Sequence, residues 1–255
     1  MSIDKNLWQK PFYKNKFPTW TCSTCGVGLL ELQKNTLNFE ESGESLAAKS
    51  HDAWDPEWLF YRFSALLKCN NQNCGDCSVI TGRGEVIEVH YQDHNNVYEQ
   101  QWVERFYPEY INPPPQIFPI PSKTPDEIRD EILASFSIFL LEPNAAGNRI
   151  RTSIETLLTH QKINKIKVIR GKRRRLSLHE RIQAFQTKHQ EISDNLLAIK
   201  WIGNAASHTT GLKTDDIFDA YEIMHHVLIE LYEKRSARIK KLTTAINKRK
   251  GTLSK

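Results

Sequence analysis

Apolar and polar positions alternate through much of the first 111 residues, which is the pattern of half-buried β-strands. Two stretches carry this pattern most clearly: FYRFSALLKC, which ends at Cys69, and SVITGRGEVIEVHY, which follows Cys77. In the second stretch, Val79 and Val86 fit strands on either side of a Gly-Arg-Gly turn. We therefore predict a small β-rich module over residues 1–111.

Prolines interrupt the alternation over residues 112–124, which read NPPPQIFPIPSKT. Proline fixes its own φ, has no N–H to donate, and holds the preceding residue in an extended conformation. The segment therefore predicts a stiff linker between two domains. The same composition also allows a ligand for an SH3-type domain, which is the alternative interpretation.

From residue 125 the apolar spacing becomes helical, with intervals of three and four residues. Thr124 and Asn144 are the predicted N-caps of the first two helices. Three more helices are predicted over 176–189, 192–208 and 214–235. Together these segments indicate an α-helical bundle over 125–235, in which a basic connection, KINKIKVIRGKRRR, joins the second and third helices, and a basic tail occupies 236–255. The predicted fold class is α+β.

Charge divides the chain in the same way as the apolar pattern. Residues 1–110 carry 10 Lys/Arg and 15 Asp/Glu, a balance of −5, whereas residues 111–255 carry 25 and 15, a balance of +10. A basic half favours polyanionic partners such as nucleic acid, although a solvated surface is the alternative. No apolar run is long enough to span a membrane or to form a signal peptide, so we expect a cytoplasmic protein without a membrane partner.

All five cysteines lie in the acidic half. Cys22 and Cys25 form one close pair, and Cys69, Cys74 and Cys77 form a second group. Two short turns that each present two thiolates suit a tetrahedral zinc ion, while disulfides are uncommon in a reducing cytosol and fit an odd number of cysteines poorly. Because Cys74 precedes a glycine, as in a zinc-knuckle turn, we predict structural Zn²⁺ on Cys22, Cys25, Cys69 and Cys74, with Cys77 as the alternate ligand.

Basic residues are densest between Lys162 and Arg181, where nine Lys/Arg stand beside one acid. The centre of this segment is a run of four consecutive basic residues: Lys172, Arg173, Arg174 and Arg175. Side chains this dense cannot all pair with acids, and they would release counterions on contact with phosphates. They are the predicted nucleic-acid-binding residues; a solvated loop is the alternative.

The sequence KWIGNAASH near the end of the fourth predicted helix contains two poor helix formers, Gly203 and Asn204. Lys200, Asn204 and His208 recur every four residues, so they share one face of that helix. Gly203 would let another helix approach closely, and the three polar side chains would then point into the crevice. Alternatively, Asn204 and His208 are buried and satisfy each other or a helix end.

These features resemble the domain of unknown function 4145 family. The resemblance rests on NRIRTSIETLL, LSLHERI, IKWIGNAASH and GLKTDDIFDAYEIMHHVLIELY, in the family's order, with a CxxC and CxxxxCG module in front that is similar to a zinc ribbon. The family is similar to the HEPN superfamily of helical bundles, many of which are metal-independent ribonucleases in toxin and anti-phage systems. The resemblance implies a HEPN-like bundle and a homodimer.

Active HEPN nucleases place an arginine and a histidine four to six residues apart on one helix. His208 matches that histidine and Asn204 matches the polar residue before it, but Gly203 stands where the arginine would be. Lys200 could supply positive charge, and Arg149 or Arg151 could supply it from the second helix. Lys200, Asn204 and His208 are thus the candidate catalytic residues.

The resulting functional expectation is a zinc-stabilised, nucleic-acid-associated or partner-binding component of a prokaryotic defence or restriction system, with RNA or DNA and a defence-system protein as partners. An active metal-independent ribonuclease that uses His208 is the first alternative. A structural adaptor that only binds protein is the second.

Overall fold

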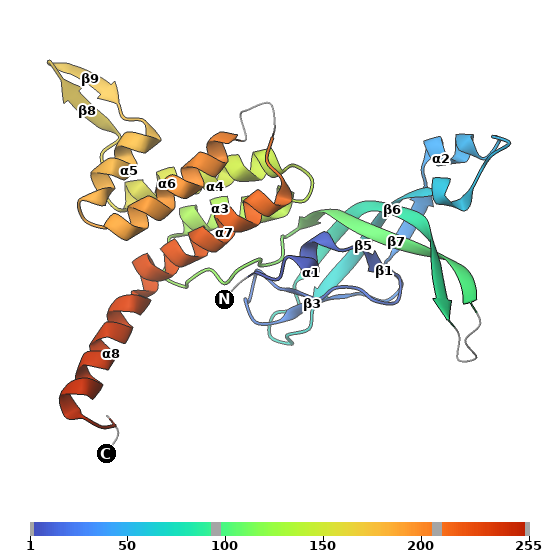
Figure 1. Cartoon of the computed structure of the whole chain (residues 1–255), viewed down its shortest axis with the longest axis horizontal. Coiled ribbons are helices and arrows are strands. Elements are labelled where there is room, and N and C mark those ends of the chain that lie inside the picture. The colour runs from blue at the N-terminus through green and yellow to red at the C-terminus, as the bar shows by residue number, and fades with distance from the viewer. Residues whose placement is uncertain (1–2, 93–97, 206–210, 253–255) are drawn as a thin grey trace. The chain divides into compact units, whose positions relative to one another are not determined.

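The computed structural model describes residues 3–92, 98–205 and 211–252 (Figure 1). The chain divides into two compact units, Met1–Ile117 with Phe136–Glu142, and Phe118–Ser135 with Pro143–Lys255. The first unit is built around an antiparallel sheet and the second around helices, so the protein is of the α+β class. The first change from one unit to the other along the chain falls between residues 117 and 118, within the proline-rich segment, and residues 136–142 return to the first unit.

The first unit is a sheet of seven strands, all paired antiparallel. The strand order is β1-β7-β6-β5-β3-β2, and β4 pairs with β5 beside this path. The strands are β1 (Phe12–Tyr13), β2 (Trp20–Thr21), β3 (Leu29–Leu32), β4 (Asn38–Glu41), β5 (Phe60–Cys69), β6 (Cys77–Gln92) and β7 (Tyr98–Asn112). Short helices, α1 (Asn6–Gln9), α2 (Gly43–Ala48) and the 3₁₀ turn η1 (Pro56–Trp58), complete the unit.

The core of the sheet follows from the alternation predicted for its strands. Along β5 every second residue from Phe63 to Cys69 is buried. Phe63, Phe12 and Phe106 come from three different strands, and their ring centroids lie 5.4 to 5.6 Å apart. Aromatic rings at this spacing stabilise a core beyond the apolar area that they bury.

The predicted Gly-Arg-Gly turn is wrong, because Gly82, Arg83 and Gly84 lie inside the continuous strand β6. The register of β6 against β7 shifts between Thr81 and Gly82, which marks a β-bulge. A Cβ at Gly82 would collide with the Tyr107 carbonyl oxygen, and a Cβ at Gly84 would lie 2.9 Å from the Phe106 ring. The glycines therefore serve close packing within the sheet rather than a reversal of the chain.

The proline-rich segment begins as part of the first unit. The Asn112–Pro113 peptide bond is cis, and the Gln116 N–H donates to the Thr21 carbonyl at 2.8 Å. Ile117 is buried. The segment is thus anchored at this end by a backbone hydrogen bond to β2.

The second unit is helical apart from one β-hairpin. Its helices are α3 (Asp126–Ile138, of which the last three residues belong to the first unit), α4 (Pro143–His160), α5 (Leu178–Gln186), α6 (Gln190–Ala205), α7 (Thr214–Leu228), the π-helical turn η2 (Ile229–Glu233) and α8 (Arg235–Arg249). The apolar stripes predicted from spacing face the interior: Ile150, Ile154 and Leu157 on α4 and Ile217 and Met224 on α7 are each no more than 1% exposed. Tyr221 is also buried, and its hydroxyl lies 2.8 Å from Ser135 Oγ.

The predicted helix caps are corrected in two places. Thr124 Oγ1 has no hydrogen-bond partner among the described residues, and the Pro125 carbonyl accepts the first helical N–H groups, from Ile128 and Arg129. Asn144 lies inside the first turn of α4, which begins at Pro143. The Asn144 Oδ1 instead accepts the Leu212 N–H at 2.7 Å, so this side chain joins α4 to the segment before α7.

The basic connection is a β-hairpin, not the loop that the sequence suggested. Strands β8 (Ile166–Ile169) and β9 (Lys172–Arg175) pair antiparallel across Arg170 and Gly171, both of which have positive φ. Two consecutive residues with positive φ are characteristic of the type I′ turn that joins tight hairpins. Ser177 caps α5 through a capping box with Glu180, and the helix begins at Leu178, two residues later than predicted.

The C-terminal basic segment is also ordered, as helix α8, where the sequence suggested a fraying tail. None of its residues is buried. Ile239, Leu242 and Ile246 recur along one side of it at helical spacing and are exposed. Among the described residues, no helix is long and apolar enough to cross a membrane.

Candidate metal centre and polar sites

The first cysteine turn follows β2 and is closed by backbone hydrogen bonds. The Gly26 N–H donates to the Cys22 carbonyl at 2.8 Å, and the Cys22 N–H donates to the Gly28 carbonyl at 2.8 Å. Gly26 has a positive φ of 66°, which glycine adopts without strain. The Gly28 N–H points at Cys25 Sγ at 3.3 Å, as backbone amides do around metal-bound thiolates.

The second cysteine turn begins at the end of β5. The Cys74 and Gly75 N–H groups both donate to the Asn71 carbonyl, at 2.9 and 3.0 Å, and Gly75 has a positive φ of 62°. Leu30 of β3 is the register partner of Cys69, so pairing of these strands brings the two turns together. Sheet pairing thus unites cysteines more than 40 residues apart in the sequence.

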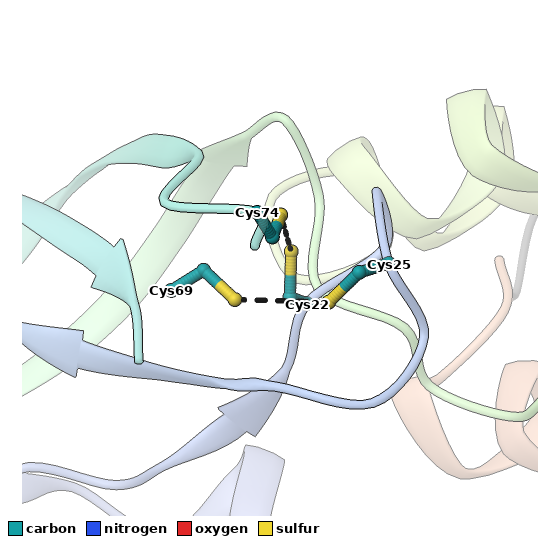
Figure 2. Close-up of side chains that lie close together, drawn as sticks. All are labelled: Cys22, Cys25, Cys69 and Cys74. Carbon is teal, nitrogen blue, oxygen red and sulfur yellow. Dashed lines mark hydrogen bonds between the residues drawn. The ribbon is translucent and has the colours of Figure 1, made fainter. Parts of the chain in front are cut away.

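The four sulfurs of Cys22, Cys25, Cys69 and Cys74 point toward one another (Figure 2) and all lie within 4.8 Å. Cys22 Sγ is 3.9 Å from Cys74 Sγ, and Cys25 Sγ is 3.7 Å from Cys69 Sγ. Sulfurs about 2.3 Å from one tetrahedral zinc ion would be about 3.8 Å apart, whereas disulfide sulfurs are separated by about 2.05 Å. The spacing therefore fits a tetrahedral thiolate site for one metal ion.

The electrostatics of the cluster also favour a cation. Hydrogen bonds from the Gly28 and Val27 backbones lower the pKa of Cys25 to about 6, so this thiol ionises readily. Burial raises the pKa of Cys69 to about 12. Ionising all four thiols in so small a volume requires a compensating positive charge, which a bound divalent metal supplies.

Cys77 stands apart from this cluster. It is exposed at the start of β6, where Lys68 is its register partner, and its sulfur lies 4.0 Å from the Gly75 carbonyl oxygen. The four sulfurs that the structure brings together therefore include Cys74 and leave Cys77 outside.

The predicted nucleic-acid-binding residues, Lys172 to Arg175, form strand β9 and are all exposed. Arg174 pairs with Glu180 at the start of α5. Arg175 is 82% exposed, and its guanidinium approaches the Glu155 carboxylate only to 4.0 Å. The hairpin leaves α5 as a two-stranded arm of the second unit (Figure 1). It thus presents its charge to solvent and is tied back to the helices mainly through Arg174.

Two of the three candidate catalytic residues, Lys200 and Asn204, lie on α6. Lys200 is 8% exposed, and its Nζ lies 3.4 Å from the centroid of the Trp201 ring. Burial, with a smaller contribution from the charge of Arg151, lowers the pKa of Lys200. His208 lies outside the described residues.

Asn204 contacts the second helix of the bundle. Its Oδ1 accepts a hydrogen bond from Arg151 Nη1 of α4 at 3.2 Å. A Cβ at Gly203 would lie 3.4 Å from both Arg151 Cβ and the Gly147 carbonyl oxygen, so α4 approaches α6 closely at this glycine. Arg149, the other arginine considered from sequence, turns away and pairs with Glu131 at 3.2 Å. One arginine therefore reaches the KWIGNAASH segment from a neighbouring helix.

Two family models match the chain, one on each part. Residues 134–249 match the domain of unknown function DUF4145, as the motifs of the helical half predicted. Residues 10–111 match the domain of unknown function DUF8608. No curated protein and no solved structure matches the chain.

Arg181 is a residue that the sequence analysis did not single out. It is 3% exposed, and it links α5 to the end of α4. A helical wheel places it with Leu178, Ile182 and Phe185 on the buried face of α5, which is an unusual position for an arginine. The position of an arginine on the apolar face of this helix could therefore have been recognised from the sequence.

Proposed function

We propose that the protein is a zinc-stabilised nucleic-acid-binding protein whose contact surface is the β8–β9 hairpin. The observation that carries this proposal is the composition of that hairpin: residues 165–175 contain seven Lys/Arg and no acid. Both strands are exposed along their whole length. Charge of this density attracts phosphate backbones through counterion release, largely independently of base sequence.

Ion pairing inside the protein leaves most of this charge available. Within the described chain, Lys172 and Arg173 have no carboxylate within 4.0 Å, and Arg175 meets one only at that limit. Exposed pairs of this kind contribute little, about 1 kcal/mol or less, so they compete weakly with phosphate. Three of the four predicted residues can therefore turn toward a ligand without breaking a strong internal contact.

The metal in the cysteine cluster is proposed to be zinc in a structural role. Four thiolates in tetrahedral positions are the ligand set that zinc prefers, and they leave no open coordination position for a substrate or water. The ion would hold the first cysteine turn, which lies between the short strands β2 and β3 of two and four residues, against the second turn. Its contribution is to the stability of the first unit rather than to chemistry.

The biological setting is proposed from the DUF4145 match and the resemblance of that family to HEPN bundles. We place the protein in a prokaryotic defence or restriction system, in the cytoplasm, as a homodimer that also binds a protein partner of that system. The competing proposal is an adaptor that binds only protein. In that case the basic hairpin would not be needed for function.

The proposal is tested by fluorescence anisotropy with labelled RNA and DNA. Replacing Lys172, Arg173 and Arg175 with Gln should weaken binding by at least about a hundredfold at low salt, because each lost phosphate contact costs about 1 kcal/mol or more. The matched control replaces Lys240, Lys241 and Lys248 of α8 with Gln; these residues are also exposed, and the change removes the same charge. Equal losses in both variants would show that net charge alone, and not the hairpin, governs binding.

A second function, metal-independent RNA cleavage, is favoured by the Arg151–Asn204 hydrogen bond. In this reading Arg151 replaces the arginine that is missing at Gly203 and stabilises phosphate charge, while His208 transfers protons. Wild-type protein should then cleave RNA in EDTA, and both His208→Ala and Arg151→Gln should abolish cleavage. Arg149→Gln is the control, and circular dichroism in the same EDTA buffer must show equal folding. Cleavage that survives His208→Ala would exclude this mechanism.

A further inference from the structure

A pocket of 680 Å³ lies in the second unit, between α4, the β9 strand and the start of α5. Its size is in the range of pockets that hold a nucleotide-sized ligand. Arg151, Thr152 and Glu155 of α4 form one wall, and Arg174 and Arg175 form another. The pocket thus lies at the base of the basic hairpin rather than on its exposed strands.

The lining of this pocket is predominantly basic. Five Lys/Arg and one histidine face two carboxylates, Glu127 and Glu155. Glu127 Oε2 lies 3.2 Å from His160 Nε2, and Glu155 stands at 4.0 Å from the highly exposed Arg175. Hydroxyl groups of three threonines and Ser177 supply further hydrogen-bonding positions, and none of the described residues that line the pocket is Phe, Tyr or Trp. Such a lining favours a phosphate group over an aromatic base.

Arg181 of α5 also lines this pocket, and it contributes a buried positive charge. Its Nη1 donates to the Glu155 carbonyl at 3.1 Å, and its Nη2 donates to Thr159 Oγ1 at 3.0 Å. Its Nε has no hydrogen-bond partner within the described chain. The partners of the guanidinium are neutral oxygens near the C-terminal end of α4, whose dipole compensates only part of the charge. Burial lowers the pKa of Arg181, but a guanidinium stays charged in proteins.

We propose that this pocket binds a phosphate group of a nucleotide or a nucleic acid. Arg151 and Arg175 are assigned to the phosphate oxygens: Arg151 donates one N–H to Asn204 while its other donors have no hydrogen-bond partner among the described residues, and Arg175 is only loosely held by Glu155. Arg181 maintains positive potential behind them, and Arg174 stays engaged with Glu180. The assignment deepens the proposed nucleic-acid function and rests on it for the view that the phosphate belongs to a polynucleotide.

Adenosine monophosphate is a suitable probe, with adenosine as the control that lacks the phosphate. Phosphorus NMR of the probe, titrated with full-length zinc-loaded protein, reports on the phosphate alone. Arg151→Gln should weaken binding of adenosine monophosphate at least about tenfold, since it removes a charged hydrogen-bond donor. Arg149→Gln, two residues away on α4 and outside the pocket, should change it less than about twofold.

A third variant separates the pocket from the hairpin. Arg173→Gln removes a charge from β9 but does not line the pocket, so it should weaken nucleic-acid binding and leave adenosine monophosphate binding unchanged. Failure of adenosine monophosphate to bind, or equal weakening by Arg173→Gln and Arg151→Gln, would overturn the pocket while leaving hairpin binding intact. The protein could instead bind adenosine monophosphate with the predicted variant pattern but fail to bind RNA or DNA. That result would support the pocket as a nucleotide site and refute the nucleic-acid function.

Discussion

Gly28 is the residue outside the cysteines on which the metal cluster depends most directly. A Cβ at this position would collide with Cys69 Sγ and come within 2.8 Å of Asn71 Cβ. The second cysteine turn can therefore approach the first only because residue 28 has no side chain. A side chain at residue 28 would therefore displace the Cys69 ligand and the turn that begins near Asn71.

Gly28→Ala should consequently weaken metal binding and lower the free energy of unfolding by roughly 2 kcal/mol or more. Gly43→Ala is the matched control, because a Cβ there meets nothing within 4 Å and residue 43 begins a helix. That control should be neutral or slightly stabilising. Thermal unfolding of both variants with bound metal checks the prediction, and equal melting temperatures would contradict it.

The identity of the metal ligands is tested by two serine substitutions. Cys74→Ser should reduce bound zinc well below one ion per chain and destabilise the protein by more than about 4 kcal/mol, as loss of a structural metal does. Cys77→Ser should retain the metal, because its sulfur lies outside the cluster. Elemental analysis of the purified variants measures this. Metal loss in Cys77→Ser but not in Cys74→Ser would reverse the assignment.

The β8–β9 hairpin is the element on which the proposed function depends, and Arg174 is its main connection to the helices. Hydrogen bonds from Arg174 and then from Ser177 lower the pKa of Glu180 to about 2 from its ordinary value of 4.5. A carboxyl whose folded-state pKa is depressed stabilises the fold above its unfolded pKa, and that contribution is lost as the pH falls toward 2. The hairpin should therefore stay attached to α5 at neutral pH and loosen in acid.

Arg174→Gln should bring the pKa of Glu180 back up toward 4.5 by removing its largest stabilising contact. Carboxyl-carbon NMR titration of the wild type and the variant measures this directly. A Glu180 pKa that stays near 2 in the variant would mean that the Ser177 capping contacts alone hold the carboxylate. Because Glu180 is accessible to solvent, the effect on overall stability should be small.

At the scale of the whole molecule, the sequence predicts the α+β class and the order of the main elements. Apolar alternation in β5 and helical stripes in α4 and α7 are strong because each element buries one face. The cysteine spacing likewise predicts which residues can gather, since short turns keep each pair together. The strands, the helices and the cysteine turns can be predicted because each depends on a pattern of residues that are close together in the sequence.

The missed features depend on contacts between distant residues. Gly82 and Gly84 suggest a turn by composition, yet the packing of Phe63 and Phe106 requires glycines within a strand. The high density of charge suggested a loop in place of the β8–β9 hairpin. Gly171, between two short stretches of strand-like sequence, was compatible with a tight turn. The link from Arg151 to Asn204 joins two helices whose relative rotation no local pattern specifies.

The salt dependence of nucleic-acid binding tests the central claim most directly. The logarithm of the affinity of wild-type protein should fall linearly with the logarithm of salt concentration, with a slope of roughly −0.7 to −0.9 per phosphate contact. If the hairpin makes those contacts, replacing Lys172, Arg173 and Arg175 with Gln should make the slope shallower by about two to three. A slope that is unchanged in the variant, with wild-type affinity retained, would contradict a nucleic-acid-binding role for the hairpin.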